Sequence, residues 1–318
     1  MFRTLAFVVA LSGLCLCSTL RADDAEDKAV AFVEKLGGRV TRDEKAPGKP
    51  IITVNLSGTE VTDAGLKELA PLKNLTTLHL SSTPVTDAGL KELAPLKQLT
   101  TLDLSSPLVT DAGLKELAAL KNLTTLYLFG APVTDAGLKE LAPLKNLTML
   151  NIGGTPVTAA GLKELAALKN LTTLYLSSTK VTATELKELA SLKHLTSLSL
   201  LGASVTDAGL KELAPLKQLT TLNLSFTKVM DEGLKELAKL TNLTSLSLYG
   251  TPVTDTGLKE LATLKELTTL DVRDTEVTDA AIKELKQVLP NCQIKKEPRE
   301  LDESLKSRRG WSRLPDIR

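Results

Sequence analysis

Residues 72–95 read LKNLTTLHLSSTPVTDAGLKELAP, and this stretch of 24 residues decides the fold. Its second half, VTDAGLKELA, recurs every 24 residues without an insertion or a deletion. Ten copies follow one another, beginning at Val61, Val85, Val109, Val133, Val157, Val181, Val205, Val229, Val253 and Val277. A fixed period of this length predicts that each copy is one supersecondary unit that stacks on its neighbours.

The local chemistry of one unit predicts a strand followed by a helix. Residues 77–81 alternate between polar and apolar, which is typical of a short strand with its leucines facing inward. Thr86 suits the N-cap of a helix, and Asp87 places negative charge at the positive helix end. Asp87 also precedes Lys91 by four residues, the favourable order for an ion pair along a helix. Pro95 then ends the helix.

Repetition of this unit predicts an α/β architecture. A strand, a helix and another strand running in the same direction place a parallel sheet on one face and helices on the other. Because one unit of 24 residues buries too little apolar surface to be stable alone, stacking has to supply the remaining burial.

The unit resembles the leucine-rich repeat through Leu75, Leu78, Leu80, Thr83, Val85 and Leu90. The segment VTDAGLKEL is similar to the ribonuclease-inhibitor-like and F-box-associated branch, and to exported 24-residue arrays of planctomycete bacteria. The resemblance covers residues 51–294. It implies a leucine-rich-repeat solenoid, a curved horseshoe with the parallel β-sheet on the concave face and helices on the convex face.

Two departures from that branch qualify the resemblance. No F-box precedes the array in this sequence, which argues against a ubiquitin-ligase adaptor. Where the branch has cysteine, this chain has a threonine whose hydroxyl is expected to bond loop backbone, at Thr59, Thr83, Thr155, Thr179, Thr227, Thr251 and Thr275.

The chain divides into four expected parts. Residues 1–22 resemble a signal peptide, with Arg3 before an apolar stretch and a passable cleavage site at Ala22. Residues 23–50 are expected to form a capping helix and a hairpin, residues 51–294 the array, and residues 295–318 a disordered charged tail. These features predict export to the periplasm, the cell envelope or the medium, with no membrane span after cleavage. If residues 1–22 are retained, the alternatives are an amphipathic or membrane anchor and a cytosolic F-box-like adaptor.

Composition narrows the classes of function. The formal net charge is +1 and the charges are evenly mixed along the chain, which argues against nucleic acid as a partner. Aromatic residues make up only 3%, so leucine, valine and alanine have to build the core. After cleavage Cys292 is the only cysteine, and it replaces a buried leucine. We therefore expect a core side chain and no disulfide.

Several motifs have a structural explanation that we prefer. The aspartates at the helix starts could bind calcium, but each already has a task at a helix N-terminus. The Asn-Leu-Thr sequons follow from the repeat consensus. His79 and His194 lie repeats apart and cannot act together. Ala159 and Ala183 replace two of the aspartates, and Glu185 replaces the usual glycine. Drift is the simpler account of these three changes, and a local change at the loop edge is the alternative.

The outward strand positions are where the repeat leaves residue choice free, so recognition is expected there. Neighbouring strands carry an expected patch ~15–20 Å long. With one more aromatic residue further along, the candidate partner-binding residues are Tyr127, Phe129, Met149, Tyr175, Leu201 and Tyr249. The competing explanation is that tyrosine and phenylalanine simply suit exposed strand positions.

Together these features predict a non-enzymatic, exported scaffold that is monomeric and needs neither cofactor nor metal. No nucleophile, base and oxyanion donor converge in the sequence, and no phosphate loop is present. The expected partner is a protein, or else a glycan, on the concave face. The structural alternative is a cell-envelope component without a specific partner.

Overall fold

The computed structural model describes residues 13–296. The first part of the expected signal peptide, residues 1–12, and nearly all of the expected tail, residues 297–318, lie outside the described residues.

Within residues 13–296, one sheet of twelve strands runs through the molecule in the order of the sequence. Every neighbouring pair is parallel except β1 and β2, and each residue pairs with its equivalent one repeat later, as Leu78 does with Leu102. The strands are β1 Arg39–Arg42, β2 Ile51–Asn55, β3 Thr77–His79, β4 Thr101–Asp103, β5 Thr125–Tyr127, β6 Met149–Asn151, β7 Thr173–Tyr175, β8 Ser197–Ser199, β9 Thr221–Asn223, β10 Ser245–Ser247, β11 Thr269–Asp271 and β12 Gln293–Lys295.

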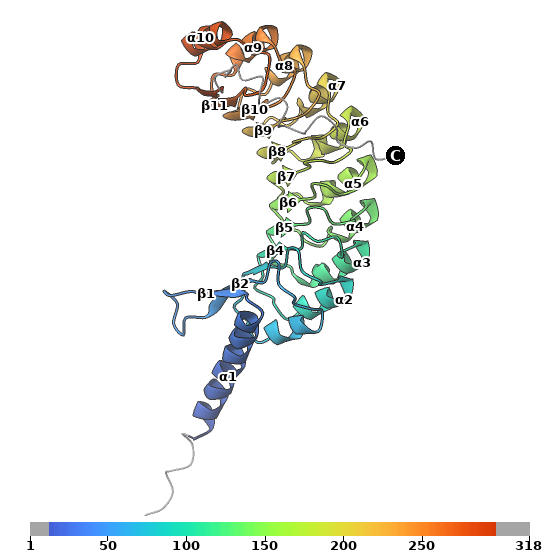
Figure 1. The fold of residues 1–318 in the computed structure, drawn as a ribbon. Helices are drawn as coiled ribbons and strands as arrows, with labels where there is room; N and C mark the ends of the chain where they lie inside the picture. The colour runs from blue at the N-terminus through green and yellow to red at the C-terminus, as the bar shows by residue number, and fades with distance from the viewer. Residues whose placement is uncertain (1–12, 297–318) are drawn as a thin grey trace, which may run out of the picture.

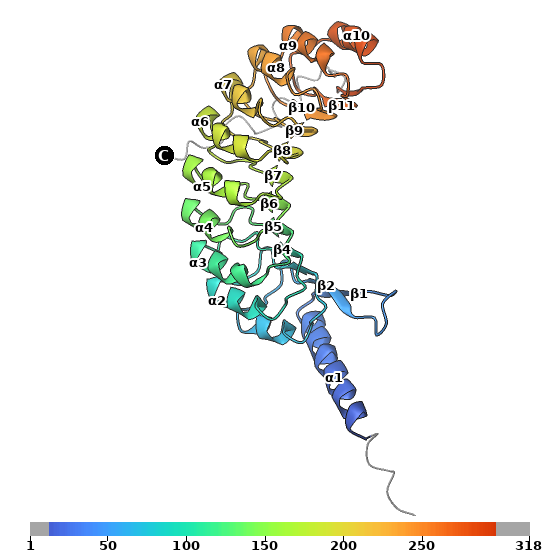
Figure 2. The same ribbon diagram turned by 180° about the vertical axis from the view of Figure 1, so that it is seen from behind.

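Short helices cover the other face. The chain forms an arc with the sheet along its inner side and the helices along its outer side (Figures 1 and 2). The α-helices are α1 Gly13–Lys35, α2 Asp87–Leu90, α3 Asp111–Leu114, α4 Asp135–Glu140, α5 Ala159–Glu164, α6 Ala183–Leu186, α7 Asp207–Leu210, α8 Asp231–Leu237, α9 Asp255–Glu260 and α10 Asp279–Val288. Most continue as a 3-10 turn, and η1 Gly65–Leu69 stands in place of an α-helix in the first repeat. The predicted α/β solenoid is confirmed.

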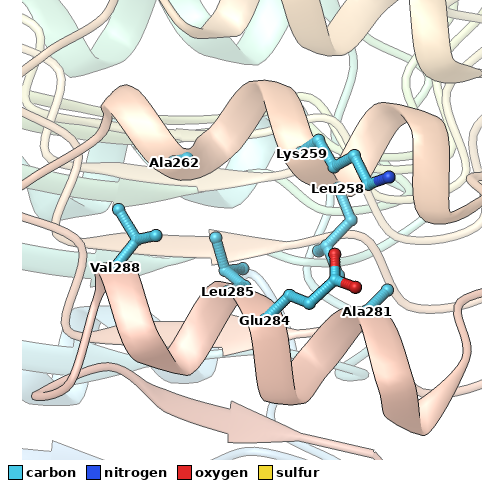
Figure 3. Close-up of a pocket in the computed structure, with 7 residues that line it drawn as sticks. All are labelled: Leu258, Lys259, Ala262, Ala281, Glu284, Leu285 and Val288. Atoms are coloured by element: carbon cyan, nitrogen blue, oxygen red, sulfur yellow. The ribbon is translucent and has the colours of Figure 1, made fainter.

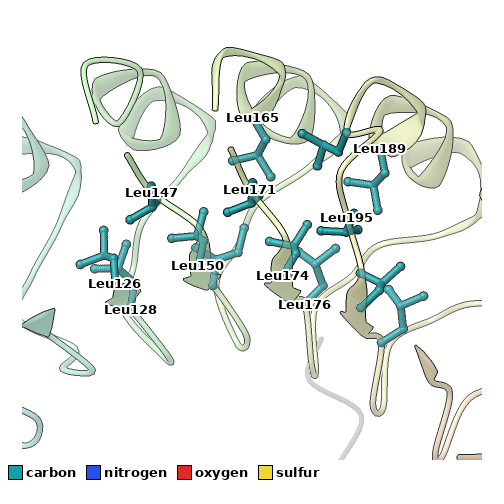
Figure 4. Close-up of a cluster of buried hydrophobic side chains, with 14 of the residues drawn as sticks. Leu126, Leu128, Leu147, Leu150, Leu165, Leu171, Leu174, Leu176, Leu189 and Leu195 are labelled. Carbon is teal, nitrogen blue, oxygen red and sulfur yellow. The ribbon is translucent and has the colours of Figure 1, made fainter. Parts of the chain in front are cut away.

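The core is a continuous stack of leucines between sheet and helices. Strand residues such as Leu126, Leu150 and Leu174 face helix residues such as Leu165 and Leu189, and all are at most 1% exposed (Figure 4). The same packing recurs in each repeat, so these core leucines are covered by their own unit and by the units on either side. Burial of this kind is the main stabilising contribution to the solenoid.

Threonine hydroxyls bond the backbone at two positions of the repeat, and the first of these is a threonine in seven repeats and Pro107, Ala131 or Ala203 in the other three. The buried Thr83 donates to the carbonyl oxygen of Leu80 at 2.7 Å, as expected for the threonines in the cysteine position. On the edge that leads into the strands, Thr100 donates to the carbonyl of Thr76 in the preceding repeat at 3.1 Å. The second bond continues from repeat to repeat and ties neighbouring units together.

The N-terminal end of the array is covered by α1 and by the antiparallel pair β1–β2. Ala29 and Val33 of α1 are buried in the common core. Arg42 of β1 is tied to Glu26 of α1 by an ion pair of 2.9 Å. Helix α1 runs without interruption through the cleavage point expected after Ala22.

At the other end, β12 adds a last parallel strand to β11. Cys292 is 4% exposed, which agrees with a core role, and burial raises the pKa of its thiol. A protonated, buried thiol is a poor nucleophile. Lys296 closes this end with an ion pair of 2.6 Å to Asp279 at the start of α10.

The helix-start aspartates act between repeats, which the sequence analysis missed. Asp63 accepts the backbone N–H of Thr86 at 2.8 Å through Oδ1 and the Thr86 hydroxyl at 2.7 Å through Oδ2. Thr86 itself caps α2, as predicted, by accepting the N–H of Ala88. The expected pairing of Asp87 with Lys91 is wrong, because the Asp87 carboxylate bonds Thr110 of the next repeat. We call this two-bond contact the aspartate clamp.

A glycine makes room for every clamp except the last, where Ala281 takes its place and both bonds of Asp255 to Thr278 are kept. A Cβ added at Gly137 would lie 2.2 Å from Oδ1 of Asp111, the aspartate that clamps Thr134. The Asp and Gly of the motif VTDAG are therefore coupled across a repeat boundary: the carboxylate of one unit occupies the space left by the glycine of the next.

Two neighbouring boundaries in the middle of the array lack the clamp, and the boundary after them keeps only its backbone bond, from the N–H of Met230 to Asp207 at 2.7 Å. Ala159 leaves Thr182 without a carboxylate from the preceding repeat, and Ala183 does the same for Thr206. Glu185 replaces the glycine at the first of these boundaries, and its carboxylate accepts both the N–H and the hydroxyl of Thr182 within its own repeat. The exchange of Gly for Glu is thus a local compensation, and we call residues 157–206 the unclamped segment.

Candidate binding face on the concave side

The inner face of the sheet presents the outward strand positions. The row at the last residue of each strand from β2 to β11, which includes Asn55, Tyr127 and Tyr175, is less free than expected. Asn55, Asp103, Asn151, Asn223 and Asp271 each accept the backbone N–H two residues later, at 2.9–3.2 Å. These side chains complete the turn that follows the strand. In the other strands of this row, the side chain does not accept the backbone N–H two residues later, and the residues are His79, Tyr127, Tyr175, Ser199 and Ser247.

Tyr127 and Tyr175 lie on β5 and β7 with the shorter Asn151 of β6 between them in register. Strand spacing places their Cα atoms about 10 Å apart. Both rings are half-buried. Two aromatic side chains therefore stand on either side of a small polar one in the middle of the sheet.

Phe129 follows β5, Met149 begins β6 and Leu201 follows β8, so these residues lie on the repeats that carry or adjoin the two tyrosines. Phe129 is 49% exposed, and its ring lies against Gly153, where an added Cβ would come within 3.0 Å of Cδ2. Met149 begins β6 and pairs with Thr125 and Thr173 on either side. We call Tyr127, Phe129, Met149, Tyr175 and Leu201 the central patch.

Tyr249, the sixth candidate, belongs to a different group two repeats beyond β8. Its ring meets Phe226 edge-on with centroids 4.6 Å apart, and the guanidinium of Arg273 lies 5.1 Å from its centre. Arg273 is itself held by Asp271 through bonds of 2.9 and 2.7 Å. The structure thus separates Tyr249 from the central patch and places it in a second cluster, Phe226–Tyr249–Arg273.

The strand pattern does not single out Phe226, because this residue lies outside the outward strand positions. It follows the strand at a turn whose equivalents are glycines or small polar residues, and its φ is +56°. A bulky residue rarely adopts this left-handed conformation. Phe226 is nonetheless 52% exposed and lies over Gly250, whose missing Cβ leaves space for the ring. An aromatic residue at a glycine-type turn position is the signal that sequence reading could have used.

Electrostatics in this second cluster are balanced locally. Burial alone would raise the pKa of Asp271, but the hydrogen bonds and charge of Arg273 outweigh burial and hold that pKa below its ordinary value. The pair is therefore ionised at neutral pH and contributes little net charge to the face.

Nothing in residues 13–296 assembles catalytic chemistry that we can identify. His79 Nδ1 lies 4.0 Å from Asp103 Oδ2, too long for the hydrogen bond that would orient a general base. The same residues hold no cluster of three His, Cys, Asp or Glu side chains suited to a metal ion. None of the helices they form is long and apolar enough to cross a bilayer.

The helix side carries a small pocket between α9 and α10 (Figure 3). Its volume is about 160 Å³, and it is lined by Leu258, Lys259, Ala262, Ala281, Glu284, Leu285 and Val288. This is smaller than the ~300–1,000 Å³ typical of ligand sites. The pocket is therefore a weaker candidate than the concave face.

Comparison with known families identifies the repeat. A model described as leucine-rich repeat matches residues 51–70, 72–94, 119–142 and 191–214. A second, described as Zer-1-like leucine-rich repeats, matches residues 210–296. No curated protein matches the chain.

Solved structures share the same architecture. Internalin C2 from Listeria monocytogenes is similar at 28% identity and a TM-score of 0.50, over 67% of this chain and 84% of that one. A TDR receptor is similar in fold at 18% identity and a TM-score of 0.50, over 89% of this chain and 45% of that one.

Proposed function

This chain is a leucine-rich-repeat protein, and from that premise we propose that it is a non-enzymatic scaffold that binds a partner protein through the central patch on its concave face. Solenoids of this kind typically use their curved inner surface for recognition. A glycan partner is the variant of this proposal that the same experiment tests.

The observation that carries the proposal is the placement of aromatic side chains where the fold does not need them. The side chains of Tyr127 and Tyr175 do not bond the turn after their strands, unlike those of the Asn and Asp residues in the same row. Phe129 is half exposed, and its ring lies against Gly153. Tyrosine and other aromatic residues dominate the energetics of protein interfaces. A cluster of them in the middle of the sheet is therefore the best-supported docking point.

The test is affinity capture from an envelope extract with the variant Tyr127→Ala/Tyr175→Ala. We expect capture of the partner to fall more than tenfold, because two anchoring rings are removed. The thermal unfolding midpoint should change little, since both rings are only half-buried. Phe226→Ala/Tyr249→Ala is the matched control, because it removes two rings from the second cluster. Capture that is unaltered by the first variant, or lowered equally by both, would remove the central patch from consideration.

We also propose that the protein acts outside the cytosol, on the basis of the signal-like residues 1–22. N-terminal sequencing of the protein purified from its own cells tests this. A mature chain beginning near Asp23 is the expected result, and a chain beginning at Met1 would contradict cleavage.

A further inference from the structure

A row of lysines follows the edge of the solenoid at which the helices lead into the strands. It contains seven lysines, one every 24 residues from Lys73 to Lys217. Each is exposed and lies in the turn before its strand. Thr241 interrupts the row, which resumes at Lys265. We call the seven residues the lysine edge.

The opposite edge carries the aspartates. Because β2 to β12 are parallel, all the turns that leave strands lie on one side and all those that enter strands lie on the other. The clamp aspartates occupy the first side and the lysines the second. Charges that mix evenly along the sequence, and nearly cancel in a net charge of +1, are thus separated in space.

The lysine edge is not neutralised by carboxylates. Within residues 13–296 none of its seven members takes part in an ion pair, whereas Lys235 on α8 pairs with Glu232 at 2.8 Å. Lys145 and Lys217 contact only carbonyl oxygens of the next repeat, at 3.3 and 3.2 Å. The ammonium groups therefore remain available to a negatively charged partner.

Asparagines hold the backbone of this edge in register. Asn122 donates to the carbonyl of Lys97, and Asn146 donates to that of Lys121, both at 2.9 Å. Asn170 continues the pattern to Lys145. The same bonds explain the sequons as structural, because their side-chain amides serve the solenoid. Their effect is to fix the spacing of the lysines from one repeat to the next.

We propose that the lysine edge binds a linear polyanion, namely an anionic polysaccharide. The spacing of the lysine positions lies between the strand spacing of ~4.8 Å and the helix spacing of ~8–10 Å. This is within about one Debye length at physiological salt, so the potentials of neighbouring lysines add. A single row of positive charge along a curved edge complements a flexible chain that bears one anionic group after another.

The residues beside the lysines favour a polysaccharide over other polyanions. The position after each of the seven lysines carries Asn, Gln or His, so no Phe, Tyr or Trp stands beside the lysine row. Single-stranded nucleic acid is usually held by bases stacked on such rings. Binding to a bilayer surface normally adds apolar side chains that enter the interface, and the turn has none at these positions.

The test compares two triple variants of equal charge in the same repeats. Lys121→Gln/Lys145→Gln/Lys169→Gln removes edge charges, and Lys115→Gln/Lys139→Gln/Lys163→Gln removes helix charges. The probe is a fluorescent dextran sulfate oligosaccharide, followed by anisotropy over a range of salt concentrations. We expect the edge variant to bind at least tenfold more weakly with a shallower salt dependence, and the helix variant to change less than twofold.

Equal losses in both variants would show that overall charge alone drives binding, and would overturn the proposal. Tighter binding of a single-stranded oligothymidylate, or of vesicles containing anionic lipid, than of dextran sulfate would also overturn it. Tyr127→Ala/Tyr175→Ala should leave dextran sulfate binding unchanged, so this proposal and that of the concave face succeed or fail separately. Unfolding midpoints confirm that each variant is folded.

Discussion

Two boundaries between repeats use the same threonine in different ways. At the clamped boundary, Thr134 is held by Asp111 of the preceding repeat, with Oδ1 2.7 Å from its backbone nitrogen. In the unclamped segment, Thr182 is held by Glu185 of its own repeat at 2.9 Å. The threonine caps a helix start in both cases, but only the first arrangement joins two repeats.

This difference shows that cohesion between repeats is separable from the folding of each repeat. The unclamped segment keeps its strands and its leucine core. It also keeps the threonine bonds that link successive repeats, such as the bond from the Thr196 hydroxyl to the carbonyl of Thr172 at 3.2 Å. It loses the clamp bonds on the edge where strands lead into helices, although backbone bonds such as that from the N–H of Ser178 to the carbonyl of Leu201 at 2.7 Å remain there. The stability of a one-dimensional array is the sum of the stabilities of its units and of the interfaces between them. On the edge where strands lead into helices, the interfaces of the unclamped segment therefore contribute least.

The largest expected effect comes from replacing the glycine of the motif by alanine, once at a clamped boundary and once at an unclamped one. Gly137→Ala should destabilise the protein by about 3 kcal/mol, because the new Cβ overlaps the Asp111 carboxylate of a charged clamp. The last clamp tolerates Ala281 at a different helix start, where Thr278 caps the N–H three residues on, whereas Thr134 caps the N–H two residues on. Gly209→Ala should change stability by less than about 1 kcal/mol. Its nearest neighbours, from 3.0 Å outward, are Leu186, Ala183 and Val205, and it faces no carboxylate.

Urea unfolding followed by circular dichroism measures both variants. Their backbone position and helix propensity are matched, so the difference between them isolates the clamp. Equal destabilisation by the two alanines would mean that crowding of the helix start, and not the carboxylate, decides the outcome.

Features set within one repeat could be predicted from the sequence. The parallel sheet, the threonine N-cap and the buried threonine hydroxyl all depend on residues a few positions apart, and the period repeats them. Contacts of a single side chain with the next repeat are harder to predict, because the partner lies far away in the sequence. The Asp87 carboxylate was expected to pair with Lys91 four residues on, and it instead bonds Thr110, 23 residues away.

The candidate site illustrates the same limit. Sequence periodicity identifies the outward rows and hence Tyr127 and Tyr175, but it does not reveal which row members complete turns. It also places Tyr249 further along the same face, but it does not reveal that the ring packs with Phe226 at a turn of positive φ. Side-chain direction at a turn depends on backbone conformation that a strand pattern does not encode.

A smaller effect is expected from restoring the clamp in the unclamped segment. Ala159→Asp alone should destabilise, because its carboxylate meets that of Glu185. Glu185→Gly alone should also destabilise, since it removes the local cap of Thr182. The double variant recreates the clamped arrangement and should be more stable than the sum of the single changes by about 1–2 kcal/mol. A double-mutant cycle in urea measures this coupling, and additive changes would contradict it.

The smallest expected effect is a dependence on acid that both arrangements share. The pKa of Asp255 is lowered chiefly by the N–H of Thr278, and that of Glu185 chiefly by the hydroxyl of Thr182. A carboxyl with a lowered folded pKa stabilises the protein above its ordinary pKa of about 4 and loses this contribution as the pH falls through the folded value. Stability should therefore be level between pH 7 and about 5 and decline below about 4. Because both groups are well solvated, the contribution of each to the free energy of unfolding is small.

Urea titrations at a series of pH values measure these contributions. Asp255→Asn should slightly flatten the decline that comes from the clamp, and Glu185→Gln should slightly flatten the decline that comes from the local cap of Thr182. A decline that neither substitution alters would assign the acid sensitivity to carboxylates elsewhere.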